Sequence, residues 1–231
     1  MAAVAVLVAG CGQGTGAAGR PASPASVAAS PSSRPAASPS PALSAWPVVV
    51  PVPSVRAHEH QTGARPPAQS HVFRAEMTDL WAAVASGRPQ LGMAAFFPVV
   101  AYDQVKAIGD PAADWQNRLV AEYRLDIRAA HRLLDGHGRA AKLIGVIVPE
   151  SESGWISPGV CDNGIGYWHV AGARLVYRVH GQTRSFGIAT LISWRGRWYV
   201  VHLGGELRTG SGGMVDQPSL GTGTPGPAGG C

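Results

Sequence analysis

The densest group of chemically active side chains lies in the segment Trp155–His169, which reads WISPGVCDNGIGYWH. It contains a thiol, a carboxylate, a phenol and an imidazole, supplied by Cys161, Asp162, Tyr167 and His169. Groups of this kind meet at the mouths of ligand pockets, and a cysteine becomes a nucleophile when a base such as histidine stands within hydrogen-bond reach. One interpretation is therefore that these four residues are candidates for the rim of a pocket.

The same segment also has a purely structural interpretation. Pro, Gly, Asp and Asn are turn-forming residues, and the aromatic side chains of Trp155, Tyr167 and Trp168 could serve only to pack. Cys161 could likewise be a small buried hydrophobic residue. Because this interpretation accounts for the composition without any reaction, we assign no catalytic residue from the sequence.

Other candidates for site chemistry are identified by residue type alone. Carboxylates and phenols that a pocket could use occur at Tyr102, Asp103, Tyr123, Asp126, Asp162 and Tyr167. Asp126 stands between Arg124 and Arg128, which favours a solvated, ion-paired helix face. His58-Glu59-His60 could chelate a metal, but no set of Cys and His residues approaches the closed pattern of a structural zinc site. We therefore expect neither a metal nor a cofactor.

Three stretches with helical periodicity precede this cluster. Apolar residues recur at spacings of three and four over Phe73–Ser86, which predicts an amphipathic helix. A second helical region is expected over Leu91–Lys106, broken near Pro98. The third is the clearest, because Asp110 can cap its N-terminus, an apolar stripe follows, and Gly136 can end it.

After the third helix the pattern changes to that of β-strands. Runs rich in β-branched and aromatic residues predict strands, which are expected at Leu143–Val148, Leu175–Val179, Phe186–Trp194 and Tyr199–Leu203. Two tight turns, His180–Thr183 and Trp194–Trp198, contain a glycine that can adopt the positive φ of a short hairpin. Three helices followed by a four- or five-stranded antiparallel meander predict an α+β domain in which a curved sheet wraps the helices.

The ending SFGIATLISWRGRWYVVHLG resembles the last two strands of the nuclear-transport-factor-2-like superfamily, the α+β cone shared with ketosteroid isomerases and polyketide cyclases. The turn Trp194-Arg195-Gly196-Arg197-Trp198 is similar to the W-x-G-x-W hairpin of many such domains. The resemblance implies a cone-like domain over residues 69–208 with a conical pocket. It also implies two uses for that pocket, either binding or isomerase-like and cyclase-like chemistry by a pocket Asp, His or Tyr, and a homodimer through the sheet.

The two flanking segments have the composition of disordered chain. Eleven of the nineteen prolines fall between Pro21 and Pro67, within a tether predicted over residues 11–68. Residues 209–231 are rich in Gly and Pro and are predicted to be a disordered tail. Such segments cannot bury enough apolar surface to offset the entropy of ordering them.

The N-terminal sequence Val8-Ala9-Gly10-Cys11 follows an apolar run and resembles the lipobox of bacterial lipoproteins. The resemblance implies that residues 1–10 are a removed signal peptide and that Cys11 carries a diacylglycerol and an acyl chain such as palmitate, which together give stable membrane attachment. The alternative is an Ala-rich N-terminus with an unrelated cysteine, since no Lys or Arg precedes the run.

Charge and cysteine content narrow the expected partners. The net charge of +5 is not gathered into a basic stripe with interleaved aromatic residues, which argues against nucleic acid. No apolar run is long enough to span a bilayer, so the lipid would be the anchor. We expect a protein on the extracytoplasmic face of the cell membrane that binds a small apolar ligand or an envelope protein. A Cys161–Cys231 disulfide is conceivable in an oxidising compartment, although the long flexible loop argues against it.

Overall fold

The computed structural model of this chain describes residues 60–205 and 211–226. The predicted signal peptide, the lipobox-like Cys11 and the tether up to residue 59 lie outside the described residues, as does Cys231. Within the part that is described, no helix is both long enough and apolar enough to cross a membrane.

The first helices begin and end where local sequence signals place them. Helix α1 (His71–Ser86) starts at Ser70, whose side chain accepts a backbone hydrogen bond, and ends at Gly87 in the left-handed conformation. The second predicted helical region is divided into a short 3-10 turn η1 (Pro89–Gly92) and helix α2 (Val99–Val105). This division follows from the fixed φ and the missing N–H of the proline that precedes α2.

A long third helical segment carries residues of the site described below. It consists of α3 (Pro111–Asp114), a π-helical turn η2 (Trp115–Leu119) and α4 (Val120–Arg132). The predicted N-cap at Asp110 is confirmed, because its carboxylate accepts a hydrogen bond from the Ala113 N–H at 2.9 Å. A π turn inside a helix is rare and is frequently found at functional sites.

The second half of the domain is an antiparallel sheet. Its strands, with a short 3-10 turn η3 (Glu150–Glu152) after the first, are β1 (Lys142–Ile147), β2 (Gly154–Ile156), β3 (Tyr167–Val179), β4 (Gln182–Trp194), β5 (Arg197–His202) and β6 (Asp216–Leu220). The main order is β1-β3-β4-β5, with β2 paired to β3 and β6 paired to β4. Both predicted hairpin turns are present, and each places two residues at positive φ, His180–Gly181 and Arg195–Gly196.

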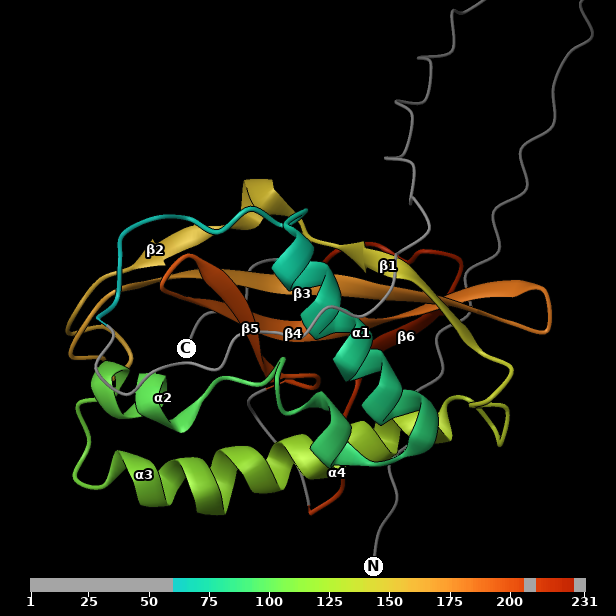
Figure 1. The fold of residues 1–231 in the computed structure, drawn as a ribbon, viewed down its shortest axis with the longest axis horizontal. Coiled ribbons are helices and arrows are strands. Elements are labelled where there is room, and N and C mark those ends of the chain that lie inside the picture. Colours follow the sequence, from blue (N-terminus) through green and yellow to red (C-terminus); the bar gives the residue numbers. More distant parts are fainter. Residues whose placement is uncertain (1–59, 206–210, 227–231) are drawn as a thin grey trace, which may run out of the picture. The chain divides into compact units, whose positions relative to one another are not determined.

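The helices lie on one side of the sheet (Figure 1). Aromatic side chains join the two layers. Trp81 of α1 contacts Tyr177 of β3 with ring centroids 5.3 Å apart. Phe97 meets Trp194 of β4 edge to face at 6.5 Å. The α+β class and the antiparallel sheet predicted from the sequence are therefore confirmed.

The described residues 211–226 of the C-terminal segment correct the prediction of a disordered tail, which covered residues 209–231. Its residues 216–220 form β6, which pairs with residues 184–187 of β4, while β5 pairs with residues 190–194 of the same strand. Because β4 is longer than β5, it leaves hydrogen-bonding groups open along its edge, and β6 occupies them. A low-complexity composition could not reveal this strand, since the pairing partner supplies its order.

Two buried charged residues hold this segment against the domain. The Asp126 carboxylate accepts hydrogen bonds from the Met214 N–H at 2.8 Å and the Gly204 N–H at 3.3 Å. The Arg174 guanidinium donates to the Gln217 carbonyl at 2.8 Å. The prediction of a solvated, ion-paired position for Asp126 is wrong, because this side chain is fully buried and serves as a backbone acceptor.

The last residues of the predicted tether also contact the domain. The Trp168 indole N–H donates to the Gly63 carbonyl, and the Trp198 indole N–H donates to the Pro66 carbonyl, both at 2.9 Å. The Gln61 amide bonds to the backbone at the β4–β5 turn. The folded domain therefore begins several residues before the predicted boundary at residue 69.

Candidate functional site

A cavity of about 480 Å³ lies where α2, η2, the loop before β3 and the ends of β3, β4 and β5 meet. Its volume lies within the range of small-molecule sites. Part of its wall is apolar and is formed by Phe97, Val105, Leu119, Ile156, Ile192 and Val201. The remaining lining residues are polar or ionisable, so the cavity combines an apolar surface with a polar wall.

All four residues that the sequence predicted for a pocket rim line this cavity. Cys161 and Asp162 lie on the loop before β3, both at positive φ, whereas Tyr167 and His169 lie on β3 itself. The buried Asn163 amide donates to the Tyr167 hydroxyl at 3.1 Å. The segment therefore forms turns, as the structural interpretation predicted, and it also lines a cavity, as the functional interpretation predicted.

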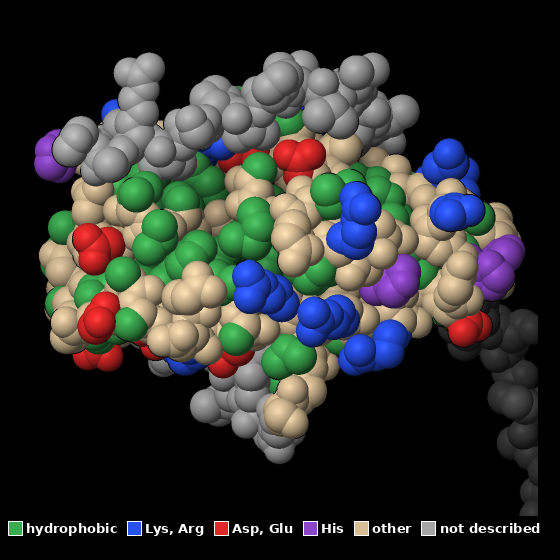
Figure 2. Space-filling model, turned by 60° about the horizontal axis from the view of Figure 1, so that its bottom comes forward, with side chains coloured by type: hydrophobic (Ala, Val, Ile, Leu, Met, Phe, Trp, Pro, Cys, Tyr) green, Lys and Arg blue, Asp and Glu red, His purple; other side chains and the backbone are tan. Residues whose placement is uncertain are grey.

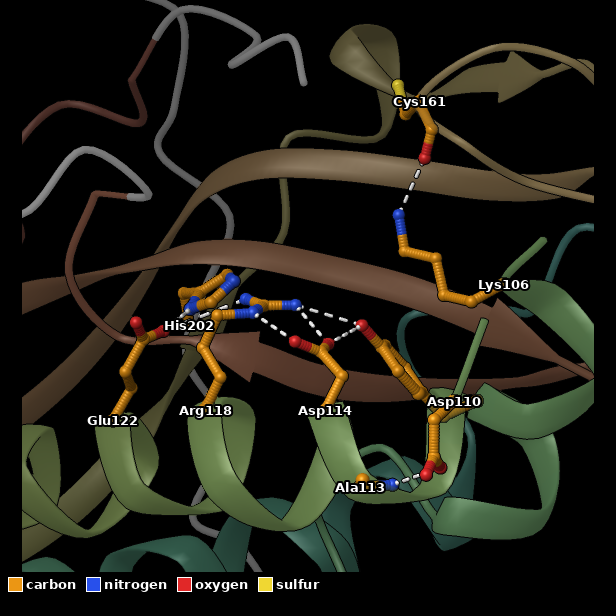
Figure 3. Close-up of polar contacts among 9 residues, drawn as sticks. Lys106, Asp110, Ala113, Asp114, Arg118, Glu122, Cys161 and His202 are labelled. Carbon is orange, nitrogen blue, oxygen red and sulfur yellow. Dashed lines mark hydrogen bonds and ion pairs between the residues drawn. The ribbon is translucent and has the colours of Figure 1, made fainter. Parts of the chain in front are cut away.

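The rim loop is fastened to the end of α2 by a series of hydrogen bonds. The Lys106 ammonium donates to the Cys161 carbonyl at 2.6 Å (Figure 3). The Ala107 N–H donates to the Asp162 carbonyl at 2.7 Å, and a further backbone bond of the same length joins Gly164 to the carbonyl at the end of α2. These contacts fix the rim relative to the helices.

Cys161 is disulfide-bonded, which rules it out as a nucleophile in this state. It is the only cysteine among residues 60–205 and 211–226, since the other two are Cys11 and Cys231. Asp162 is exposed at the rim. Of the four predicted residues, only His169 therefore combines a half-buried position with a side chain that can exchange a proton near neutral pH.

The His169 imidazole faces the cavity from β3, opposite Ile192 of β4. Burial lowers the pKa of His169 below its ordinary value, so the ring is neutral at neutral pH. Its ring makes no hydrogen bond or ion pair to the described residues. A neutral, half-buried imidazole of this kind can accept or donate a hydrogen bond to a bound molecule.

The polar wall opposite the rim is built from one face of the third helical segment. Asp114 and Arg118 lie one turn apart, and the Arg118 guanidinium binds the Asp114 carboxylate through two bonds, Nε to Oδ1 at 2.8 Å and Nη2 to Oδ2 at 2.6 Å (Figure 3). The Tyr102 hydroxyl donates to the same carboxylate and accepts from Arg118 Nη2 at 2.9 Å. The three side chains therefore supply hydrogen-bond partners to one another.

The environment of this triad shifts the pKa values of its members. Hydrogen bonding from Arg118 holds the pKa of Asp114 below its ordinary value. Burial raises the pKa of Tyr102, and its hydrogen bond to Asp114 raises it further. At neutral pH the triad is accordingly an arginine cation, a carboxylate anion and a neutral phenol.

The same helix face continues to Glu122, which approaches a histidine of the sheet. The His202 Nδ1 atom lies 3.6 Å from Glu122 Oε2, and Arg118 Nη1 lies 4.0 Å from the same oxygen. His202 is buried at the end of β5, where it pairs with Thr190 of β4. Glu122 therefore links the arginine of the helix to the imidazole of the sheet.

The formal charges around the cavity nearly balance. Lys106 and Arg118 contribute two positive formal charges, and the carboxylates of Asp114, Glu122 and Asp162 contribute three negative ones. Figure 2 shows one face of the molecule, on which acidic, basic and apolar side chains are all present. Among the described residues no group of three or more His, Cys, Asp and Glu side chains could hold a metal. The cavity is therefore suited to an uncharged ligand with an apolar body and a polar end.

The sequence indicated the residues of the rim loop and β3 that line the cavity, but not the residues of the helical wall opposite them. Tyr102 was a candidate by residue type, but Asp114, Arg118 and His202 were not singled out. Asp114, Arg118 and Glu122 follow one another at intervals of four, a spacing that places them on one helix face. That signal was present, but it did not reveal that the face borders a cavity.

No family model, no curated protein and no solved structure matches this chain.

Proposed function

We propose that this protein is a lipid-anchored binding protein on the extracytoplasmic face of the membrane, and that its cavity takes a small uncharged ligand without converting it. The observation that carries the proposal is the cavity of about 480 Å³ with one apolar wall and one polar wall. An apolar surface supplies affinity, and a few fixed polar groups supply orientation.

The state of the polar wall favours binding over catalysis. Tyr102, Asp114 and Arg118 hydrogen-bond to one another, and a reactive group must instead be available to the substrate. The disulfide on Cys161 removes the thiol from consideration. A ligand can still bond to the outer edges of this network while the network keeps its geometry.

Two features support the location. The lipobox-like Val8–Cys11 followed by a Pro-rich tether is the arrangement of a lipoprotein, and two or three acyl chains give stable attachment. The disulfide on Cys161 is typical of an oxidising compartment. We further propose a nuclear-transport-factor-2-like cone, which is supported by helices on one side of an antiparallel sheet and by a cavity at their junction.

The binding proposal is tested with an uncharged fluorescent probe, N-phenyl-1-naphthylamine. We expect saturable binding by the purified chain. Ile192→Trp should weaken it about tenfold or more, equivalent to a loss of about 1.4 kcal/mol, because the indole fills part of the cavity. The matched control is Leu91→Trp, which adds the same ring at an exposed position. Equal affinity for both variants would place the probe elsewhere and contradict the proposal.

The anchor is tested by intact mass spectrometry of the protein extracted from membranes of an expressing bacterium. We expect a mature chain that starts at Cys11 and carries a diacylglycerol. Cys11→Ala should remain unprocessed and leave the membrane fraction. An unprocessed, unmodified wild-type chain would overturn the anchor without affecting the cavity.

His169 favours a second candidate function, a small isomerase or cyclase-like enzyme. Its neutral ring faces the cavity and makes no hydrogen bond or ion pair to another described residue. A general base must be accessible to the substrate in this way. The test is deuterium exchange at the α-carbon of 2-tetralone, an uncharged ketone, in D₂O. An enzyme of this kind would catalyse the exchange, and His169→Ala would abolish the catalysis; exchange at the uncatalysed rate in the wild type would eliminate this candidate.

A further inference from the structure

The disulfide on Cys161 connects the rim of the cavity to another part of the chain. Cys161 is disulfide-bonded, and the chain offers only Cys11 and Cys231 as partners. We propose that Cys161 is bonded to Cys231, so that a disulfide fastens the C-terminal segment to the rim of the cavity.

The C-terminal segment is already docked on the sheet a short distance before Cys231. After β6, the Gly221 N–H donates to the Thr183 carbonyl at 2.8 Å, and the Gly226 N–H donates to the Gly172 carbonyl of β3 at 3.2 Å. The contact with β3 is tight, because a Cβ atom on Gly172 would lie 2.5 Å from the Gly226 nitrogen. The chain is therefore held against β3 as far as Gly226.

The chain that remains after Gly226 is short, and it starts close to the strand that the Cys161 loop enters. Cys231 lies five residues beyond Gly226, and five residues span at most about 17 Å. Cys161 lines the same cavity as His169, and along β3 His169 lies three residues, about 10 Å, from Gly172. The loop that carries Cys161 leads directly into that end of β3, so the segment docks on the strand that the Cys161 loop enters.

Cys11 is the less favourable partner for two reasons. It is separated from His60, the first described residue, by a chain about ten times longer than that between Gly226 and Cys231, and this difference lowers the chance of closing the loop roughly thirtyfold. The second reason rests on the proposed function, in which the Cys11 sulfur forms a thioether with the lipid and is not free to form a disulfide.

The bond forms by ordinary thiol–disulfide exchange. The Cys231 thiolate attacks one sulfur of the disulfide of an envelope thiol oxidoreductase, which forms a mixed disulfide and releases the enzyme's other sulfur as a thiolate. The Cys161 thiolate then attacks the Cys231 sulfur of this mixed disulfide and displaces the enzyme sulfur bonded to it. The two thiols lose two protons and two electrons, and the oxidoreductase leaves as a dithiol. Because the Cys161 carbonyl accepts from Lys106 at 2.6 Å, the bridge holds both the C-terminal segment and the rim.

The direct test is a tryptic map of the full chain, alkylated without reduction. The proposal predicts a linked pair of peptides, residues 143–174 and residues 209–231. An alkylated Cys161, a link between two copies of Cys161, or a link to the peptide that contains Cys11 would each overturn it. A link to Cys231 together with an unlipidated Cys11 would support this inference while overturning the lipid anchor, so the two proposals fail separately.

The second test is thermal unfolding of two serine variants. The bridge closes a loop of about 70 residues, so Cys231→Ser should lower the Tm by on the order of 10 °C. Reductant should lower the wild-type Tm to that of the variant and should not affect the variant itself. Cys11→Ser is the matched control and should leave the Tm unchanged. An unchanged Tm in Cys231→Ser would contradict the proposal.

Discussion

A buried carboxylate between α1 and β5 makes the stability of this domain sensitive to pH. Glu76 is completely buried on α1, and its Oε1 accepts from Arg197 Nε at 3.1 Å. Its second oxygen, Oε2, has no hydrogen-bond partner among the described residues. Burial raises the pKa of Glu76 from 4.5 to about 7, although the Arg197 charge opposes the shift.

The sign of the effect follows from the raised pKa. The folded protein binds this proton more tightly than the unfolded chain, so the contribution of Glu76 is fully present below pH 4.5 and is lost as the pH rises through about 7. A shift of about 2.5 units corresponds to about 3 kcal/mol. We therefore expect Glu76 to lower the free energy of unfolding by about that amount between pH 4.5 and pH 8.5.

The perturbation is Glu76→Gln, which keeps an oxygen acceptor facing Arg197 and does not titrate. Urea denaturation of both proteins across this pH range gives two stability curves, and their difference cancels the titration of all other groups. We expect the wild type to lose about 3 kcal/mol relative to the variant. Glu152→Gln, at an exposed position, is the control and should show no such trend. A difference curve that is flat with pH for Glu76→Gln would refute the reasoning.

Three further predictions concern the cavity wall, the C-terminal segment and assembly. Tyr102→Phe removes the hydroxyl that accepts from Arg118, and should cost about 1–2 kcal/mol in urea denaturation; no loss would show that the network is not formed in solution. Asp126→Ala leaves the Gly204 and Met214 N–H groups without their buried acceptor, and should cost about 2–4 kcal/mol and speed hydrogen exchange in residues 211–226. Sedimentation equilibrium should show a homodimer if the sheet is used for assembly, and a monomer at high concentration would contradict that expectation.

Features encoded within a few neighbouring residues could be predicted from the sequence. The N-cap at Asp110, the break at Pro98 and the glycine-containing hairpin turn Trp194–Trp198 depend on local backbone chemistry. The alternation of helical and strand periods gave the α+β class for the same reason. The placement of Cys161 and His169 at a cavity followed from the density of polar groups in one short segment, and both line the cavity.

Features that join distant segments could not be predicted in this way. Strand β6 has no periodicity of its own, and it exists because β4 extends past β5 and offers an open edge. Asp126 is buried because backbone N–H groups far along the chain reach its carboxylate. The contact of Tyr102 with Arg118 likewise depends on how α2 packs beside η2.

The sequence by itself therefore determined the helical regions, the strands β1, β3, β4 and β5 in their order, and one polar segment, but not β2 and β6. Helix caps, turns and periodicity act between residues close in the chain. Tertiary structure alone decided that this segment faces the arginine–carboxylate pair across a cavity, and that Glu76 is buried beside Arg197 with one oxygen unpaired. Burial and desolvation depend on what packs around a group, and those neighbours lie far away in the sequence.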